Sequence, residues 1–296
     1  IMRDFFAGRA LVFGIILGIL GLGFIGSILF HDKPEPVLTE EKSETPGPQH
    51  TVIGRSVEGR PIDAYTYGNG RMRLLLVGGI HGGYEWNTVI FAYKFLDYLD
   101  LNPQVVPENI TVTVIPSLNP DGVYKVIGKE GRFTEKDLVA GKSTVPGRFN
   151  AHEVDLNRNF DCQWKPESVW KNNPVSPGTK AFSEPEALAL RDFVLKNTFR
   201  AVVFWHSQAG AVYASECGKG ILPETLSIMN AYAKASGYLA VKSFDAYETS
   251  GDAEGWLASI GIPTIAVEFK THETIEWAEN LAGVKALFEY YDLLTP

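Results

Sequence analysis

Cysteine is scarce in this 296-residue chain, which contains two, Cys162 and Cys217. They form neither a CxxC pair nor a zinc-finger spacing, so the cysteines predict no thiolate metal site. Two cysteines in an exported protein can form a disulfide, and they can equally remain as buried free thiols. The sequence leaves both states open.

Basic residues are also outnumbered, because 27 Lys and Arg stand against 35 Asp and Glu and the net charge is −8. Binding to phosphates needs a dense Lys/Arg surface, so we predict no nucleic-acid partner. Hydrophobic residues make up 45% and charged residues 21%, which is normal for a globular protein. No internal repeat divides the chain. One large domain with an appendage is therefore expected.

Charge is missing altogether from residues 10–30, a run that is largely apolar. A membrane-spanning helix needs about 20 apolar residues. Arg3 and Arg9 precede the run, and net acidic residues follow it. By the positive-inside rule, we predict that residues 1–30 form a cytoplasmic stub and a transmembrane anchor, with the rest outside the cytoplasm. The alternative is a cleaved signal peptide and a secreted protein, although the apolar part of such a peptide is usually shorter.

Residues 31–50 are rich in proline and acids and contain almost no large apolar side chains. Such a composition favours an extended linker over a core element. The globular domain is therefore expected to occupy residues 51–296.

Within this domain, strand-like apolar runs alternate with stretches of helical spacing. The expected strands are residues 72–80, 110–116, 201–205 and 264–269. The expected helices are residues 86–101, 184–197, 223–235 and 276–291. This alternation predicts a three-layer α/β/α fold around a central mixed, largely parallel sheet. Ligands of such sheets gather at the carboxyl ends of the strands.

Three polar residues stand at or near these strand ends. His81 follows the strand at 72–80, His206 follows the strand at 201–205, and Glu268 lies inside an apolar strand. Each histidine alone is also compatible with an ordinary loop or core position. A buried carboxylate, however, is costly unless it is paired or metal-linked. Two histidines and one carboxylate make a catalytic zinc shell with room for water, and a second carboxylate can then act as the base.

Two stretches in the middle of the chain resemble a known family. Residues 147–150 read Gly-Arg-Phe-Asn and residues 155–160 read Asp-Leu-Asn-Arg-Asn-Phe. They are similar to the G-R-x-N and D-L-N-R-N-F stretches of the zinc carboxypeptidases. Residues 119–122 resemble the family's N-P-D-G turn, residues 53–62 its opening hairpin and residues 247–256 its substrate-covering tyrosine segment. The pieces occur in the family's order, which implies a carboxypeptidase fold and activity for the domain.

The resemblance implies one zinc ion held by His81, Glu85 and His206. The family usually has two residues between the first histidine and the glutamate, whereas two glycines and a tyrosine stand here. Glycine tolerates backbone conformations that other residues avoid, so the loop can absorb the extra residue. Zinc in such a site lowers the pKa of its bound water towards about 7.

The resemblance also assigns the groups that act on the substrate. Glu268 is expected to take a proton from the attacking water and pass it to the leaving amine. Arg148 is expected to stabilise the oxyanion. Asn157 and Arg158 are expected to hold a free C-terminal carboxylate, and Tyr247 to close over the terminal residue. A carboxylate clamp beside a hydrolytic metal makes an exopeptidase, so the predicted partner is a peptide with a free C-terminus.

Glu254 lies seven residues after Tyr247. In the family this position often lines the pocket for the terminal side chain, and an acid there goes with basic substrates. The resemblance therefore implies a preference for Lys, Arg or diaminopimelate ends. Diaminopimelate suits an enzyme that faces a cell-wall compartment, but its second amino acid head also needs a cation partner. The alternative interpretation is that Glu254 is a solvated helix charge.

Two other functions compete with this prediction. An amidohydrolase similar to aspartoacylase and succinylglutamate desuccinylase would share the fold and the zinc ligands, but the predicted anchor and the Tyr247 segment argue against it. A non-catalytic peptide-binding ectodomain is the second alternative. Pure binding needs neither Glu268 nor Arg148, so their presence favours an enzyme.

Overall fold

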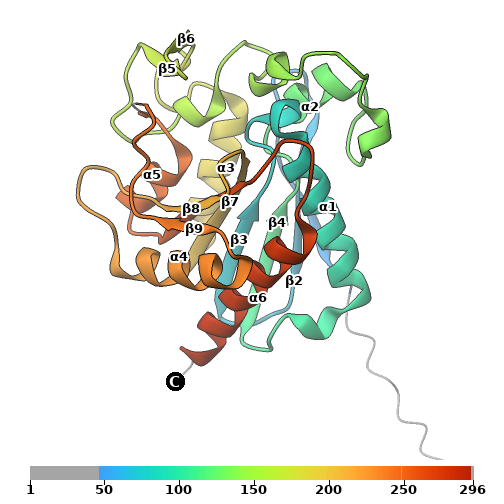
Figure 1. Cartoon of the computed structure of the whole chain (residues 1–296), viewed down its shortest axis with the longest axis vertical. Helices are drawn as coiled ribbons and strands as arrows, with labels where there is room; N and C mark the ends of the chain where they lie inside the picture. Colours follow the sequence, from blue (N-terminus) through green and yellow to red (C-terminus); the bar gives the residue numbers. More distant parts are fainter. Residues whose placement is uncertain (1–46, 248, 295–296) are drawn as a thin grey trace, which may run out of the picture. The chain divides into compact units, whose positions relative to one another are not determined.

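The computed structural model describes residues 47–247 and 249–294 (Figure 1). The anchor predicted at residues 10–30 and most of the linker predicted at residues 31–50 lie outside the described residues, so both stay predictions. In the part of the chain that is described, no helix combines the length and the hydrophobicity needed to cross a membrane. The first described strand begins at Gln49, just inside the range predicted for the linker.

Among the described residues, eight strands form one sheet in the order β1-β2-β4-β3-β7-β10-β8-β9. Their bounds are β1 Gln49–Arg55, β2 Pro61–Tyr67, β3 Met72–Val77, β4 Ile110–Ile115, β7 Ala201–Ser207, β8 Ala211–Ala214, β9 Leu239–Val241 and β10 Thr264–Phe269. The central strands β4, β3, β7 and β10 run parallel. Antiparallel pairs join β1 to β2, β2 to β4 and β8 to β10. The expected mixed sheet and the expected opening hairpin are confirmed.

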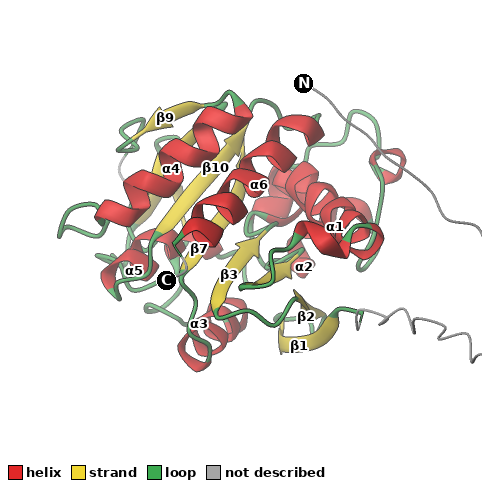
Figure 2. Ribbon diagram, turned by 90° about the horizontal axis from the view of Figure 1, so that it is seen from below, coloured by secondary structure: helices red, strands yellow, loops and turns green. Residues whose placement is uncertain are grey.

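Helices cover both faces of this sheet (Figure 2). Their bounds are α1 Trp86–Leu101, α2 Pro120–Ile127, α3 Pro185–Lys196, α4 Pro223–Ser236, α5 Ala253–Ser259 and α6 Trp277–Leu293. One apolar cluster joins α1, α2, α4 and α6 to one face, and a second joins α3 and α5 to the other. Leu74 and Leu76 of β3 enter the first cluster and Leu75 and Val77 the second. Successive side chains of a strand point to opposite faces, so one strand serves both layers.

Of the predicted strand ends, the two next to the polar residues singled out above are wrong. β3 ends at Val77 rather than at residue 80, because Gly79 adopts a φ of +61° that turns the chain out of the sheet. β7 continues through Ser207, because Ser207 still pairs in parallel register with Phe269 of β10. His206 therefore lies within its strand rather than after it.

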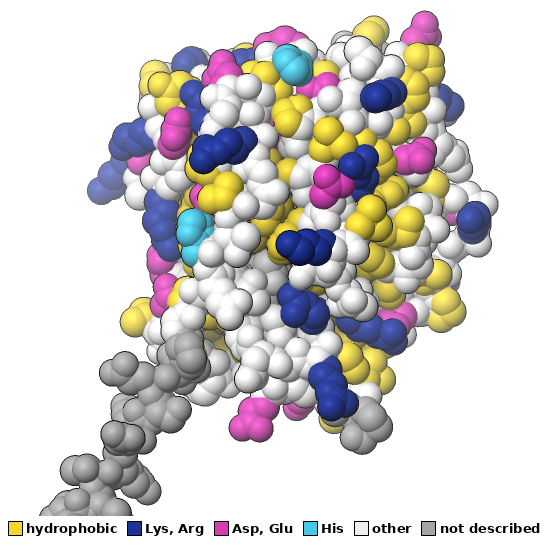
Figure 3. All heavy atoms as spheres, turned by 180° about the vertical axis from the view of Figure 1, so that it is seen from behind, with side chains coloured by type: hydrophobic (Ala, Val, Ile, Leu, Met, Phe, Trp, Pro, Cys, Tyr) yellow, Lys and Arg dark blue, Asp and Glu magenta, His cyan; other side chains and the backbone are white. Residues whose placement is uncertain are grey.

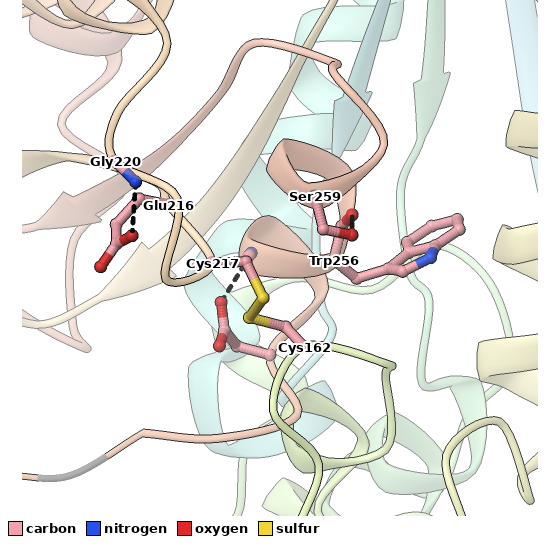
Figure 4. The surroundings of a disulfide bond; sticks show 8 residues. Cys162, Glu216, Cys217, Gly220, Trp256 and Ser259 are labelled. Carbon is pink, nitrogen blue, oxygen red and sulfur yellow. Dashed lines mark hydrogen bonds between the residues drawn. A yellow bond between two sulfur atoms is a disulfide. The ribbon is translucent and has the colours of Figure 1, made fainter.

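The two cysteines are joined in a disulfide with a Cα–Cα distance of 5.8 Å, so the free-thiol alternative is wrong. Cys162 lies two residues after the Asp-Leu-Asn-Arg-Asn-Phe stretch, and Cys217 lies three residues after β8. Figure 4 shows the bond beside the helix that carries Trp256 and Ser259, which is α5. The bond thus ties together two loops that are far apart in the sequence.

The face seen in Figure 3 carries charged side chains of both signs, interspersed with hydrophobic ones. Several exposed ion pairs occur in the described chain, for example Arg200 with Glu224. Such surface pairs contribute about 0–1 kcal/mol each. The fold therefore rests mainly on the two apolar clusters and not on its surface charges.

Candidate active site

The predicted site residues meet at the carboxyl ends of the parallel strands. His81 follows β3, His206 lies near the end of β7, and Glu268 lies near the end of β10. Glu268 is the register partner of His206, so these two residues stand on neighbouring strands at the same level. The strand-end location predicted from the sequence is confirmed.

Three side chains converge as the ligands of one metal ion would. His81 Nδ1 lies 2.8 Å from Glu85 Oε1, and His206 Nδ1 lies 3.1 Å from Glu85 Oε2. The two Nδ1 atoms are 3.3 Å apart. One ligand atom from each residue lies within 4.8 Å of the other two, and all three residues are buried. Two imidazole nitrogens and a carboxylate oxygen are a donor set that zinc favours, so the residues present fit a zinc ion.

A short 3-10 helix at residues 82–85 absorbs the extra residue before Glu85. Gly82 has a φ of +45°, and a Cβ there would lie 2.6 Å from a backbone carbonyl oxygen. Only glycine fits such a position, and it lets the turn bring Glu85 back to His81. Burial raises the pKa of Glu85, but the neighbouring His81 and His206 lower it more, so the pKa falls below its usual range. The carboxylate is therefore ionised and available as a ligand.

Glu268 stands where a base for an attacking water is needed. Its half-buried side chain lines the cavity beside the metal ligands. Burial raises its pKa to about 7; His206 opposes the rise, and the charges of Glu85 and Glu254 add to it. A carboxyl group that titrates near neutral pH can both accept a proton and give it back.

Arg148 is held in place on two sides. Its side chain is only 2% exposed, and its Nε donates to Asp155 Oδ2 at 2.9 Å. Its guanidinium carbon lies 4.5 Å from the ring centre of Trp170. Trp170 ends β5 (Ser168–Trp170), which forms a small hairpin with β6 (Asn173–Val175). Burial and stacking leave the guanidinium with little freedom to move.

A cavity of about 210 Å³ opens beside the metal ligands. Its lining contains nearly all the residues predicted from the sequence, namely His81, Arg148, Asn157, Arg158, His206, Tyr247, Glu254 and Glu268. It also contains Cys162 and Cys217, so the disulfide is part of its wall. Asp252 and Lys242 line it as well, and neither was predicted from the sequence.

Arg158 and Asn157 share one wall of this cavity. The Arg158 guanidinium donates to the backbone oxygens of Asn157, at 2.5 Å, and of Val169, at 3.3 Å. It lies 5.9 Å from the ring centre of Tyr247. Asn157 Oδ1 accepts from the Ala253 N–H at 2.8 Å and so holds the first turn of α5. The wall therefore combines a fixed cation with an aromatic ring.

Glu254 is buried, with 5% of its surface exposed, so the interpretation as a solvated helix charge is wrong. Its Oε1 lies 2.7 Å from His206 Nε2. Burial raises the pKa of Glu254, but its hydrogen bond with His206 and the charge there lower it more. Burial and the Glu254 charge in turn raise the pKa of nearby Asp252 to about 6. Two acids thus concentrate negative charge at this end of the cavity.

Comparison with known proteins places this site in a family. A sequence model described as "Zinc carboxypeptidase" matches residues 38–285, which is most of the chain. The chain belongs to the zinc carboxypeptidase family. Members of this family are metallopeptidases that use one catalytic zinc ion, and in this chain His81, Glu85 and His206 form the group that fits such an ion. Membership favours the peptidase over both alternatives, the desuccinylase-like amidohydrolase and the non-catalytic ectodomain.

Several relatives of this zinc carboxypeptidase are named as peptidases. Gamma-D-glutamyl-L-diamino acid endopeptidase 1 of Lysinibacillus sphaericus is 29% identical over 224 residues, covering 67% of this chain and 55% of that protein. The chain thus spans little more than half of that relative's length. The carboxypeptidase N catalytic chain of Homo sapiens is 28% identical over 206 residues, covering 62% of this chain and 43% of that one.

Solved structures of carboxypeptidases and a related amidase share the fold. Murein-tripeptide amidase MpaA from Escherichia coli O157 has a TM-score of 0.58 at 25% identity, covering 85% of this chain and 93% of that one. Bovine thrombin-activatable fibrinolysis inhibitor has a TM-score of 0.65 at 20% identity, covering 84% and 91%. The second likeness shows the fold alone.

Sequence reasoning missed several residues that complete the site of this zinc carboxypeptidase. Asp155 stands in the Asp-Leu-Asn-Arg-Asn-Phe stretch itself, so that motif held a signal for it. Trp170, Asp252 and Lys242 carried no such signal, because each reaches the site through a loop or a short element with no periodic pattern. Their positions follow only from the packing of the domain.

Proposed function

We propose that this zinc carboxypeptidase removes the last residue from peptides that end in a free carboxylate. The observation that carries the proposal is the position of Asn157 and Arg158, which line the cavity together with His81 and His206. A guanidinium presents several N–H donors in one plane and so matches a carboxylate. A peptide end held there brings its last peptide bond next to the metal ligands, and internal bonds lack that anchor.

The residues around the scissile bond have separate tasks. When bound, zinc would activate a water molecule and polarise the scissile carbonyl. Glu268 takes a proton from the attacking water and returns it to the leaving amine. Arg148, held by Asp155 and stacked on Trp170, presents positive charge to the oxygen that becomes negative. Because these groups are positioned before substrate arrives, little reorganisation is needed during the reaction.

We also propose a preference for terminal residues that carry a side-chain amine, as in Lys or a diamino acid of a cell-wall peptide. Asp252 and Glu254 both line the cavity, and an ammonium group between them would offset their mutual repulsion. Lys242 lines the same cavity and offers a cation for the second carboxylate of diaminopimelate. The names of two similar proteins, a gamma-D-glutamyl-L-diamino acid endopeptidase and a murein-tripeptide amidase, support this class of substrate.

We propose, further, that the enzyme acts outside the cytoplasm, tethered by residues 10–30. Arg3 and Arg9 before this charge-free run support the orientation. The disulfide between Cys162 and Cys217 also supports it, because disulfides persist in oxidising compartments. Secretion after cleavage of the same segment stays the alternative.

A matched panel of peptides tests the exopeptidase proposal. Each peptide is offered with a free and with an amidated C-terminus, and its products are identified by mass spectrometry. Loss of a buried charge-assisted pair typically costs about 2–5 kcal/mol, so the amides should be cut roughly thirtyfold to a few thousandfold more slowly. Arg158→Gln should remove most of this discrimination.

The same panel tests the exopeptidase activity and the preference for a terminal amine separately. Equal cleavage of free and amidated peptides would show that the free carboxylate is not recognised, and cleavage at internal bonds would show an endopeptidase. Equal rates on peptides ending in Lys, diaminopimelate and Leu would instead remove only the preference for an amine. The exopeptidase assignment would survive that second result.

A further inference from the structure

The two histidines of the predicted metal centre present the same nitrogen to it. His81 Nδ1 and His206 Nδ1 both face Glu85 and lie 3.3 Å apart. Each Nε2 therefore points to a different partner behind the centre. The proton of a neutral imidazole sits on one nitrogen only, so the partner of Nε2 decides whether Nδ1 is free to bind a metal.

The two Nε2 atoms have unequal partners. His206 Nε2 lies 2.7 Å from Glu254 Oε1, and both residues are at least 95% buried. His81 Nε2 lies 3.6 Å from Asp155 Oδ1, which is too long for a hydrogen bond. Asp155 is also shared, because it accepts from Arg148 Nε at 2.9 Å. The Glu254 contact is thus the closer and the more direct of the two.

Glu254 is itself held by the start of helix α5. The backbone N–H of Ala253 donates to Asn157 Oδ1 at 2.8 Å, and the Asn157 side chain also hydrogen-bonds Glu254. Asp252 caps the helix by accepting from Gly255 N–H at 2.7 Å. These contacts fix the backbone on both sides of Glu254. Its carboxylate is therefore a rigid partner for His206 and not a mobile side chain.

We propose that Glu254 is a positioning residue for the metal centre, which keeps the proton of His206 on Nε2 and leaves Nδ1 free as a ligand. A carboxylate behind a ligating imidazole fixes the ring and raises its basicity, and loss of such a partner typically weakens metal binding about 10–100-fold. The proposal rests on zinc binding and not on the substrate preference proposed above. It gives Glu254 a role in addition to the substrate preference that the family resemblance implies.

Zinc affinity of the full chain, measured by competition with a chromogenic chelator, tests the proposal without any substrate. Glu254→Leu should bind zinc about 10–100-fold more weakly than the wild type. Glu254→Gln keeps an acceptor oxygen but loses the charge, so its zinc affinity should fall between those of the wild type and Glu254→Leu. Glu216→Gln is the matched control, because Glu216 is an exposed acid that lines the same cavity, and its zinc affinity should not change.

Two further measurements separate positioning from a purely structural role. Thermal unfolding of the metal-free proteins should give the same midpoint for Glu254→Gln and the wild type, although their zinc affinities differ. In zinc-loaded wild type, nitrogen NMR should find the His206 proton on Nε2. Unchanged zinc affinity in Glu254→Gln and Glu254→Leu would overturn the proposal. A His206 proton on Nδ1 would also overturn it, and this measurement on the wild type does not depend on the folding of any variant.

Discussion

At the scale of single residues, Glu268 is the side chain whose protonation the reaction depends on. It lies opposite His206 on the neighbouring strand and lines the cavity. Glutamine keeps its shape but cannot accept a proton. Glu268→Gln should therefore keep zinc and substrate binding and lose about 10²–10⁴-fold in kcat. Steady-state kinetics with zinc analysis checks this, and a variant with near wild-type kcat would show that another group activates the water.

The pKa of Glu268 also predicts how activity depends on pH. Burial raises this pKa to about 7, and a nearby zinc cation favours the carboxylate and so lowers it again. Because the base works only when ionised, kcat/KM should rise with pH and level off above a midpoint below about 7. A pH series of kcat/KM checks this rise. A kcat/KM that falls as the pH rises towards about 7 would contradict the assignment of Glu268 as the base.

At the scale of elements, the disulfide joins the segment after residues 155–160 to the segment after β8. Its cysteines are 55 residues apart in the sequence. Loss of a native disulfide typically costs about 2–5 kcal/mol, so the double variant Cys162→Ser/Cys217→Ser should unfold at lower denaturant concentration. Zinc affinity should stay near that of the wild type, because the three metal ligands come from other segments. An unchanged denaturation midpoint would show that the bond does not stabilise the fold.

Among the helices and strands, the longer ones were predictable from their own apolar spacing. Helix α1 (Trp86–Leu101) and strand β10 (Thr264–Phe269) have the bounds that their apolar spacing predicts. Short elements such as β9 and the β5–β6 hairpin were missed, since three residues carry no measurable period. The end of β7 was also missed, because its last two residues are held by pairing with β10 and not by their own hydrophobicity.

At the scale of the whole molecule, the orientation of the chain in the membrane can be tested. If residues 10–30 anchor the protein with its catalytic domain outside, a protease added to intact cells should release that domain by cutting within residues 31–50. Immunoblotting of the released fragment and of the cells checks this, with a cytoplasmic protein as the control. Protection of the domain until the cells are lysed would reverse the predicted orientation.

The sequence by itself determined the parts of this protein that rest on local pattern or on motif. Alternating apolar strands and helices predicted the layered α/β fold, and strand-end polar residues predicted where the chemistry lies. The motif at residues 155–160 identified the family before any contact was known. The ligand set His81, Glu85 and His206 also followed from motif and order, and the structure brings these three side chains together.

Only the tertiary structure decided how the site is supported. Glu254 meets His206 across 48 residues of sequence, and Trp170 stacks on Arg148 from a hairpin with no periodic pattern. The pairing of Cys162 with Cys217 was likewise open until the two loops were placed. Contacts of this kind depend on how distant segments pack, so the local sequence around each residue does not predict them. For that reason the sequence points to Glu254 only as a pocket acid, and the fold alone shows its contact with the predicted metal ligand His206.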